Sequence, residues 1–183
     1  MESIKILEAE HDNISSMLDI IKYMTMEILT GNNIKTDHFR LVSSFISEYA
    51  DGYHHDKEEK ILFQNMLAYS GSVAKPLIEN GMLVEHDLAR YYNRSLKTSL
   101  DNYDKEPSKE NLVDILTFSL SYRDLLTRHI EKENSTVFTF AERSLDKDKK
   151  RDTDNEFNLY EKKKSNSVEI QLNNLKKLQD IYL

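Results

Sequence analysis

The sequence predicts an all-α fold, namely an up-down-up-down four-helix bundle followed by an additional C-terminal amphipathic helix. Two observations lead to this prediction. The 183 residues include only four glycines and two prolines, too few turn-forming residues for a many-stranded β fold. Four long segments repeat apolar residues at spacings of three and four, as helices that pack on a common seam do. A chain of this length is enough for one domain with a sizeable core.

The first two predicted helices are bounded by turn and cap residues. The first covers residues 2–30 and ends at Gly31, a residue suited to the left-handed conformation that closes many helices. The second starts near Thr36, which fits an N-cap, and continues to residue 68, before the turn-forming residues 70–72. The short connection between them makes these helices antiparallel neighbours.

The third and fourth predicted helices are separated by Pro107. The third covers residues 82–103 and the fourth covers residues 109–143, so they too are joined by a short connection. Short connections between four long helices favour the up-down-up-down arrangement.

The C-terminal part of the chain changes in composition. Residues 146–164 are rich in charge, and we expect them to form a partly disordered linker. Residues 165–183 repeat apolar residues at helical spacing and predict an amphipathic helix. This helix either docks on the bundle or pairs with another chain, so we expect a monomer or a homodimer. The predicted organisation is a bundle over 1–145, a linker and a final helix.

Charge and composition exclude several classes of function. The formal charge is −7, from 32 acidic and 25 basic side chains, which argues against a nucleic-acid partner. Cysteine is absent, which excludes disulfides, Fe–S ligation and thiolate zinc sites. No apolar run approaches the roughly 18 residues that a membrane span needs, and the N-terminal residues do not resemble a signal peptide. We therefore expect a cytoplasmic protein with no membrane partner.

Each of the four predicted bundle helices places a histidine in its apolar seam. These residues are His11, His55, His86 and His129. In the second and fourth helices a glutamate follows four residues later, as Glu59 and Glu133. Residues four apart lie on the same helix face, about 5–6 Å apart at Cβ. A rise of about 1.5 Å per residue brings the four histidines to similar depth in an up-down bundle.

Four imidazoles and two carboxylates in a buried seam predict a metal site. This set suits two first-row transition ions bridged by the carboxylates, whereas calcium and magnesium prefer oxygen ligands. A single zinc ion would leave two of the six groups unused. Two iron ions use all six, and manganese remains an alternative. The competing structural interpretation makes the histidines hydrogen-bonded core residues and the His-Glu pairs surface ion pairs.

Five other polar residues near these positions are not expected to be ligands. His54 points about 100° away from His55 on a regular helix and is expected beside the site or at the surface. Glu58 is expected to face solvent, and His38, in a first helical turn, to be exposed. Glu10 and Glu85 each precede a seam histidine, so we expect them at the surface, because adjacent helical residues diverge.

Four local strings resemble the hemerythrin-like, or HHE cation-binding, family. They are AEHDNI at His11, HHDKEEKILF from His54, EHDLAR at His86 and RHIEKENSTVF from Arg128. The resemblance covers about residues 1–145, and it is specific because four motifs agree in order. It implies a four-helix bundle with an oxo-bridged di-iron centre. Glu59 and Glu133 would bridge the irons, and the histidines would be terminal ligands.

Two departures from the oxygen-carrying members of that family narrow the resemblance. Those members have a second histidine four residues along the third helix, where this chain has Arg90. They also have aspartate five residues after the fourth-helix histidine, whereas here Glu133 follows four residues after His129. The chain therefore resembles the branch with four His and two Glu, linked to nitric oxide, peroxide and repair of iron centres. The repair proteins of that branch carry an additional N-terminal domain with cysteines, whereas this chain starts ten residues before His11 and contains no cysteine, so we do not expect a repair protein.

The resemblance implies a di-iron protein that binds and reacts with dioxygen, nitric oxide or peroxide. Such a protein would act in oxidative or nitrosative stress and would need an electron donor if it turns over. One alternative is an oxygen- or iron-sensing module whose C-terminal helix reports the state of the site. Another alternative is a store of dioxygen without catalytic turnover, which Arg90 makes less favoured. The sequence leaves open whether the protein is an enzyme.

Overall fold

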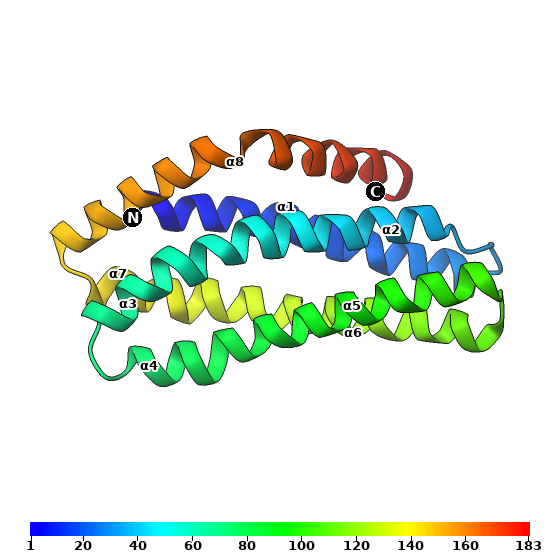
Figure 1. Cartoon of the computed structure of the whole chain (residues 1–183), viewed down its shortest axis with the longest axis horizontal. Coiled ribbons are helices and arrows are strands. Elements are labelled where there is room, and N and C mark those ends of the chain that lie inside the picture. The colour runs from blue at the N-terminus through cyan, green and yellow to red at the C-terminus, as the bar shows by residue number, and fades with distance from the viewer.

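The computed structural model consists of four antiparallel helical rods and a long fifth helix (Figure 1). It describes the backbone of residues 1–183 and every side chain except those of Lys164 and Ser165. No strand occurs in the part of the chain that it describes. The predicted all-α bundle with an additional C-terminal helix is confirmed.

Each rod is one helix or a succession of segments wound as α-helix and π-helix. The first rod is α1, Glu2–Leu29. The second comprises α2 (Thr36–Phe45), the π-helical segments η1 (Ile46–His55) and η2 (Glu58–Leu62), and α3 (Phe63–Tyr69). The third comprises α4 (Ala74–Leu77), η3 (Ile78–Met82) and α5 (Leu83–Lys105). The fourth comprises α6 (Lys109–Lys132), η4 (Glu133–Val137) and α7 (Phe138–Ser144).

Helix α8 covers Lys147–Tyr182 and lies along α1 and the second rod (Figure 1). The sequence predicts a linker over residues 146–164, but α8 runs through that segment without interruption. Asp146 caps its start by accepting a hydrogen bond from the Lys149 amide at 2.8 Å. Phe157 and Leu178 are fully buried against the bundle, so tertiary packing holds the charged segment helical.

The far end of α8 also buries a residue that the sequence places at the surface. Tyr182 lies 2.7 Å from Nδ1 of His38 through its hydroxyl and packs against the His38 ring edge-on. His38 is consequently buried, and the expectation that it is exposed is wrong. In this structure α8 docks on the bundle of its own chain.

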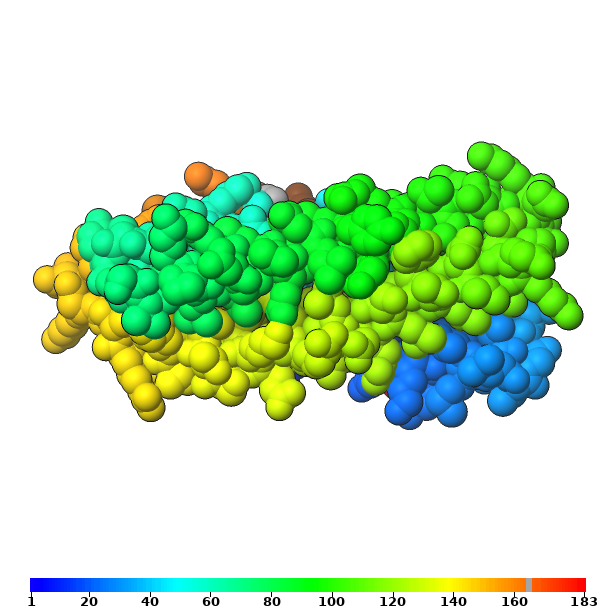
Figure 2. All heavy atoms as spheres, turned by 90° about the horizontal axis from the view of Figure 1, so that it is seen from below, coloured from blue at the N-terminus to red at the C-terminus, as the bar shows by residue number. Residues whose placement is uncertain are grey.

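The apolar core has two parts, and a layer of polar residues separates them. One cluster includes Ile14, Tyr49, Leu96 and Ile130, and the other includes Leu7, Leu62, Met82 and Val137. In the first three rods the seam histidine lies between residues of the two clusters. In the fourth rod His129 lies beside Ile130 at the edge of the first cluster, and the four histidines share one level of the bundle. Figure 2 shows the face of the molecule on which the third and fourth rods lie side by side. Among the described residues, no helix has the length and apolar character to cross a membrane.

Candidate metal centre

The second rod brings more polar residues to the bundle centre than a regular α-helix would. Ile46, Ala50, His54, Glu58 and Leu62 are all buried and follow one another at intervals of four residues. In a regular α-helix a strict four-residue repeat would drift by about 40° at each step. The π-helical winding of η1 and η2 has more residues per turn than an α-helix and turns such a row back against that drift. The row therefore stays buried along the rod, through the polar layer.

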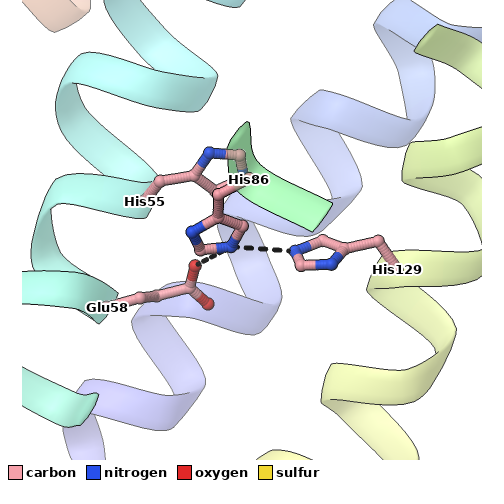
Figure 3. Close-up of side chains that lie close together, drawn as sticks. All are labelled: His55, Glu58, His86 and His129. Atoms are coloured by element: carbon pink, nitrogen blue, oxygen red, sulfur yellow. Dashed lines mark hydrogen bonds and ion pairs between the residues drawn. The ribbon is translucent and has the colours of Figure 1, made fainter. Parts of the chain in front are cut away.

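A first group of possible ligands comprises His55, Glu58, His86 and His129. Figure 3 shows the parallel rings of His55 and His86, with Glu58 beside them and His129 opposite. The ring centroids of His55 and His86 are 3.8 Å apart, and the Nε2 atoms of His86 and His129 are 3.1 Å apart. Glu58 Oε2 lies 3.6 Å from His86 Nε2. All four side chains are buried, and their ligand atoms lie within 4.8 Å of one another.

A second group comprises His11, His54, Glu58 and Glu133, again with ligand atoms within 4.8 Å of one another. Glu58 belongs to both groups, because its Oε1 lies 3.6 Å from His54 Nε2. Glu133 also faces both groups, since its Oε2 is 3.2 Å from Nε2 of His11 and 3.2 Å from Nε2 of His129. Two adjacent groups of donors thus share two carboxylates.

Many of these buried atoms have no conventional hydrogen bond. Among the described side chains, the atoms without such a partner include Nε2 of His11, His54 and His55, and all four carboxylate oxygens of Glu58 and Glu133. Leaving a buried polar atom unpaired costs about 1–3 kcal/mol, and more for a charged group. Metal ions between the two groups would satisfy these atoms together. The donor set, rich in imidazole, fits first-row transition metals.

Polar partners fix the outer nitrogens of four histidines. Nδ1 lies 2.8 Å from Asn134 Oδ1 for His11 and 2.8 Å from Glu10 for His54. For His86 the partner is Glu59 at 2.7 Å, and for His129 it is Glu85 at 2.9 Å. A histidine whose Nδ1–H donates to a carboxylate or amide oxygen keeps its Nε2 free for a metal. These contacts orient the four Nε2 atoms toward the centre.

Two glutamates that the sequence places at the surface therefore lie behind histidines. Glu10 is buried against His54, so the expectation of a surface residue is wrong. Glu85 keeps its carboxylate against His129 and Lys132 at the edge of the bundle. The sequence signal was present in both cases, since each glutamate lies one residue before a seam histidine and 44 residues before its partner in the structure.

Glu58 and Glu59 are adjacent in sequence but have different surroundings in the structure. Glu58, expected to face solvent, is fully buried and shared by both groups. The Glu59 side chain is one quarter exposed, and its Oε1 accepts from His86 Nδ1 at 2.7 Å and from Arg90 Nη2 at 2.6 Å. Five of the six predicted ligands lie in the two groups, namely His11, His55, His86, His129 and Glu133. Glu59 does not, and the assignment of metal ligands stays a prediction.

His54 joins the site as well, and the reason is the register of the second rod. The string HHDKEE contains two pairs at a spacing of four, His54 with Glu58 and His55 with Glu59. The buried row from Ile46 to Leu62 passes through the first pair. The neighbouring row Phe45, Tyr49, Tyr53, Lys57 and Ile61 has the same spacing and is also buried, so the four-residue repeat alone does not identify His54 and Glu58.

Ionisable groups crowd the candidate centre and shift one another's pKa values. Burial and the neighbouring Glu133 raise the pKa of Glu58 well above its usual range. Burial opposes ionisation of Glu133 too, but the facing histidines outweigh it and hold its pKa well below its usual range. Burial also lowers the pKa of His55 to about 3. For His129, the carboxylates of Glu133 and Glu85 overcome burial and raise the pKa to about 9.

A small cavity lies beside His55, on the side of Arg90. Its volume is about 20 Å³, which is enough for one water molecule. Its lining includes Asp51, Asn93 and Tyr122, and the Tyr122 hydroxyl has no hydrogen-bond partner in the described structure. Arg90 donates from Nε to Asp51 at 2.8 Å and so does not point into the histidine groups. Polar and apolar side chains both line the cavity, and its volume admits only a molecule about the size of water.

Comparison with known proteins agrees with this geometry. The family model of the hemerythrin HHE cation-binding domain matches residues 2–141. Searches of the curated proteins and of the solved structures gave no match. The matched segment covers the first three rods and the fourth as far as residue 141, with both groups of histidines and carboxylates, and α8 lies beyond it. The chain belongs to the hemerythrin HHE cation-binding domain family.

Proposed function

We propose that this protein holds two iron ions between its four rods and uses them to bind and react with dioxygen, nitric oxide or peroxide. One observation carries the proposal: Glu58 belongs to both groups of buried donor residues, as a carboxylate that bridges two ions must. Membership of a cation-binding family supports a metal at this place. Iron is proposed because imidazole and carboxylate donors together suit it, and manganese is the alternative.

The proposed ligand set has two halves. The His54 half consists of His11 and His54, and the His129 half consists of His55, His86 and His129. Glu58 and Glu133 are the carboxylates common to both. This set keeps five of the six ligands predicted from the sequence, replaces Glu59 by Glu58 and adds His54. His55 supplies a third imidazole to the His129 half, where the third rod has Arg90 in place of a second histidine.

The chain's own residues would orient and shield the ions. The carboxylates and the amide behind Nδ1 of His11, His54, His86 and His129 hold those rings in the tautomer that a metal needs. The apolar clusters on either side exclude bulk water. The bound irons would supply redox equivalents and an open coordination position. The cavity beside His55 limits the ligand to small molecules, and Tyr122 is placed to donate a hydrogen bond there.

The physiological role follows from the class of ligand. A protein that consumes nitric oxide or peroxide would serve in oxidative or nitrosative stress, with an external electron donor to restore the irons. A sensing module is the second candidate, favoured by the contact of α8 with residues that adjoin His54. The cytoplasmic location expected from the sequence stays a prediction.

The test begins with metal content. Protein loaded anaerobically with iron(II) and desalted should hold two irons per chain, measured by elemental analysis. Glu58→Gln should lose at least one iron, because it removes a shared charge, whereas Glu59→Gln should still hold two. If Glu59→Gln loses iron and Glu58→Gln does not, the bridging role belongs to Glu59. Fewer than two irons in the unaltered protein would overturn the two-ion centre.

Rapid mixing then distinguishes the functions. The di-ferrous protein is mixed with dioxygen, nitric oxide or hydrogen peroxide, and its visible spectrum is followed. Fast irreversible oxidation or repeated turnover with a reductant supports the reactive protein that we propose. A stable adduct that reverses on removal of dioxygen would overturn it in favour of a store, and no reaction with any of the three would favour a sensor of iron.

A further inference from the structure

Lys57 is an unusual residue in this bundle because its ammonium group is fully buried. It lies in the second rod between the two donor-bearing positions His54 and Glu58, and none of its side chain is exposed. A buried charge is costly unless it is paired and hydrogen-bonded. The mechanism proposed above makes no use of Lys57, so its pairing needs another explanation.

Two carboxylates from opposite sides satisfy Lys57. One is Glu10 of α1, whose Oε1 forms a short contact with Lys57 Nζ. The other is Glu161 of α8, whose Oε1 accepts from the same nitrogen at 2.6 Å. The ammonium also lies 3.7 Å from the centre of the Tyr53 ring, a favourable cation–π distance. The ammonium thus joins α8 to the inner rods.

Glu10 carries this connection to the candidate metal centre. Its second oxygen, Oε2, accepts from His54 Nδ1 at 2.8 Å, while His54 Nε2 faces Glu58. The chain of contacts is therefore Glu161, Lys57, Glu10 and His54, in that order. Comparable contacts to His86 and His129 come from residues of the four rods alone. Only the His54 half has a described contact chain that starts on α8.

The α8 end of the chain is itself held in place. The Tyr53 hydroxyl donates to Glu161 Oε2 at 2.5 Å, so both carboxylate oxygens have a partner. The preceding residue, Tyr160, donates to Asp56 Oδ2 at 2.8 Å, and Phe157 is fully buried one turn earlier. These contacts fix the position of Glu161 whenever α8 is docked.

Glu10 and Glu161 share the one ammonium group of Lys57. With Glu161 present, Lys57 Nζ is held between α1 and α8, and Glu10 can direct Oε2 to His54. Without that second charge, Glu10 alone would have to compensate a fully buried ammonium, and its carboxylate would turn toward Lys57 with both oxygens. His54 would then lose the partner that orients its ring.

We propose that Glu161 is a positioning residue for the His54 half of the metal centre, and that metal binding there and docking of α8 favour each other. This inference rests on the proposed two-ion centre. The coupling is reciprocal: a contact that strengthens metal binding must be strengthened by metal binding to the same degree. Helix α8, which lies outside the segment matched by the family model, is thus part of the working site.

The experiment compares Glu161→Gln with Glu156→Gln. Both change a glutamate of α8 to its neutral isostere, but Glu156 is exposed and its described side-chain contact is a 3.5 Å one with Asn65. Each protein is titrated anaerobically with iron(II), and the two irons are distinguished by Mössbauer spectroscopy. Glu161→Gln should bind one of the two irons about tenfold more weakly, at the low end of the effect of outer partners of ligating histidines.

The control variant, and whether one iron or both bind more weakly, decide the result. Glu156→Gln should match the unaltered protein at both irons. A Glu161→Gln protein that matches it too, or that weakens both irons equally, would overturn the positioning role while leaving the two-ion centre intact. If the unaltered protein fails to bind two irons, both proposals fail together. Circular dichroism checks that the helical content of each variant is unchanged.

Hydrogen exchange measures the coupling in the opposite direction. In the unaltered protein, iron loading should slow amide exchange in α8 around residues 153–161 by the same factor by which Glu161 strengthens iron binding. In Glu161→Gln this protection by iron should disappear. Equal protection in the two proteins would overturn the coupling.

Discussion

The two halves of the candidate centre use the same kinds of donor but have different surroundings. Behind His54 lies a buried ion network, in which Glu10 and Lys57 are almost completely enclosed and Glu161 closes the outer side. Behind His86 and His129 lie partly exposed pairs, Glu59 with Arg90 and Glu85 with Lys132. The cavity large enough for a water molecule is on this second side. The side of His54 is thus enclosed by buried charges, whereas the side of His86 and His129 is partly exposed and holds the cavity.

The largest expected effect comes from removing the carboxylate of Glu133, which faces both halves. Glu133→Ala should abolish binding of both irons, because its carboxylate lies 3.2 Å from a histidine of each half. Elemental analysis after iron loading measures the loss. His54→Ala should by contrast lose one iron and keep the other. Retention of two irons by Glu133→Ala would remove this residue from the ligand set.

A second prediction compares the lysines on the two sides by the stability of the metal-free protein. Lys57→Met should lower the free energy of unfolding by about 3–5 kcal/mol, because it leaves buried carboxylates without their cation. Lys132→Met should change it by less than about 1 kcal/mol, because that lysine is 47% exposed. Chemical denaturation measures both. Equal effects would mean that the two sides are not as different as their burial indicates.

The third prediction concerns pH and the His129 half. The pKa of His129 in the metal-free fold is about 9, above its ordinary 6.5, so the folded state holds the proton more tightly than the unfolded chain. The associated stability is fully present below pH 6.5 and is lost as pH rises through 9. Denaturant unfolding of metal-free protein at several pH values should show this decline.

The variant Glu85→Gln provides the control for that pH dependence. It removes one of the two carboxylates that raise the pKa of His129, so the decline should shift to lower pH. Metal must displace the same proton, and iron uptake at neutral pH should therefore release protons, measurable in weakly buffered solution. A metal-free stability that is flat between pH 6.5 and 9 would contradict the assigned pKa.

The smallest expected effect on stability concerns the cavity. Tyr122→Phe removes a buried hydroxyl that has no partner in the described structure, so the free energy of unfolding should stay the same or rise slightly. Iron content should be unchanged. If small ligands enter beside His55, their reaction with the di-ferrous protein should be slower in the variant. A rate equal to that of the unaltered protein would mean that small ligands do not enter beside His55.

Much of the fold could be predicted from the sequence because its signals are local. Apolar spacing located the four rods, and Gly31 and Pro107 marked turns between them. The predicted linker over residues 146–164 is instead mostly helical, since that helix depends on contacts such as that of Phe157 with residues far away in the chain. Propensity is a weak guide where tertiary packing decides.

The candidate site could be predicted as a seam of histidines and glutamates, but not its register in the second rod. Regular α-helical geometry favours neither of the pairs His54–Glu58 and His55–Glu59, and the choice between them depends on the π-helical winding of η1 and η2. That winding is set by packing along the whole rod. The contact between Lys57 and Glu161 could not be predicted from the sequence either, because the two residues meet only when α8 docks.

The buried row from Ile46 to Leu62 also indicates where this scaffold could be extended by protein engineering. Its residues recur at four-residue intervals, and His54 and Glu58 lie in the middle of it. Ala50 and Leu62 are the next residues of the row on either side, and both are buried. A donor side chain introduced at Ala50 would lie four residues before His54 in the same buried row, which makes Ala50 the position to test for an additional metal ligand.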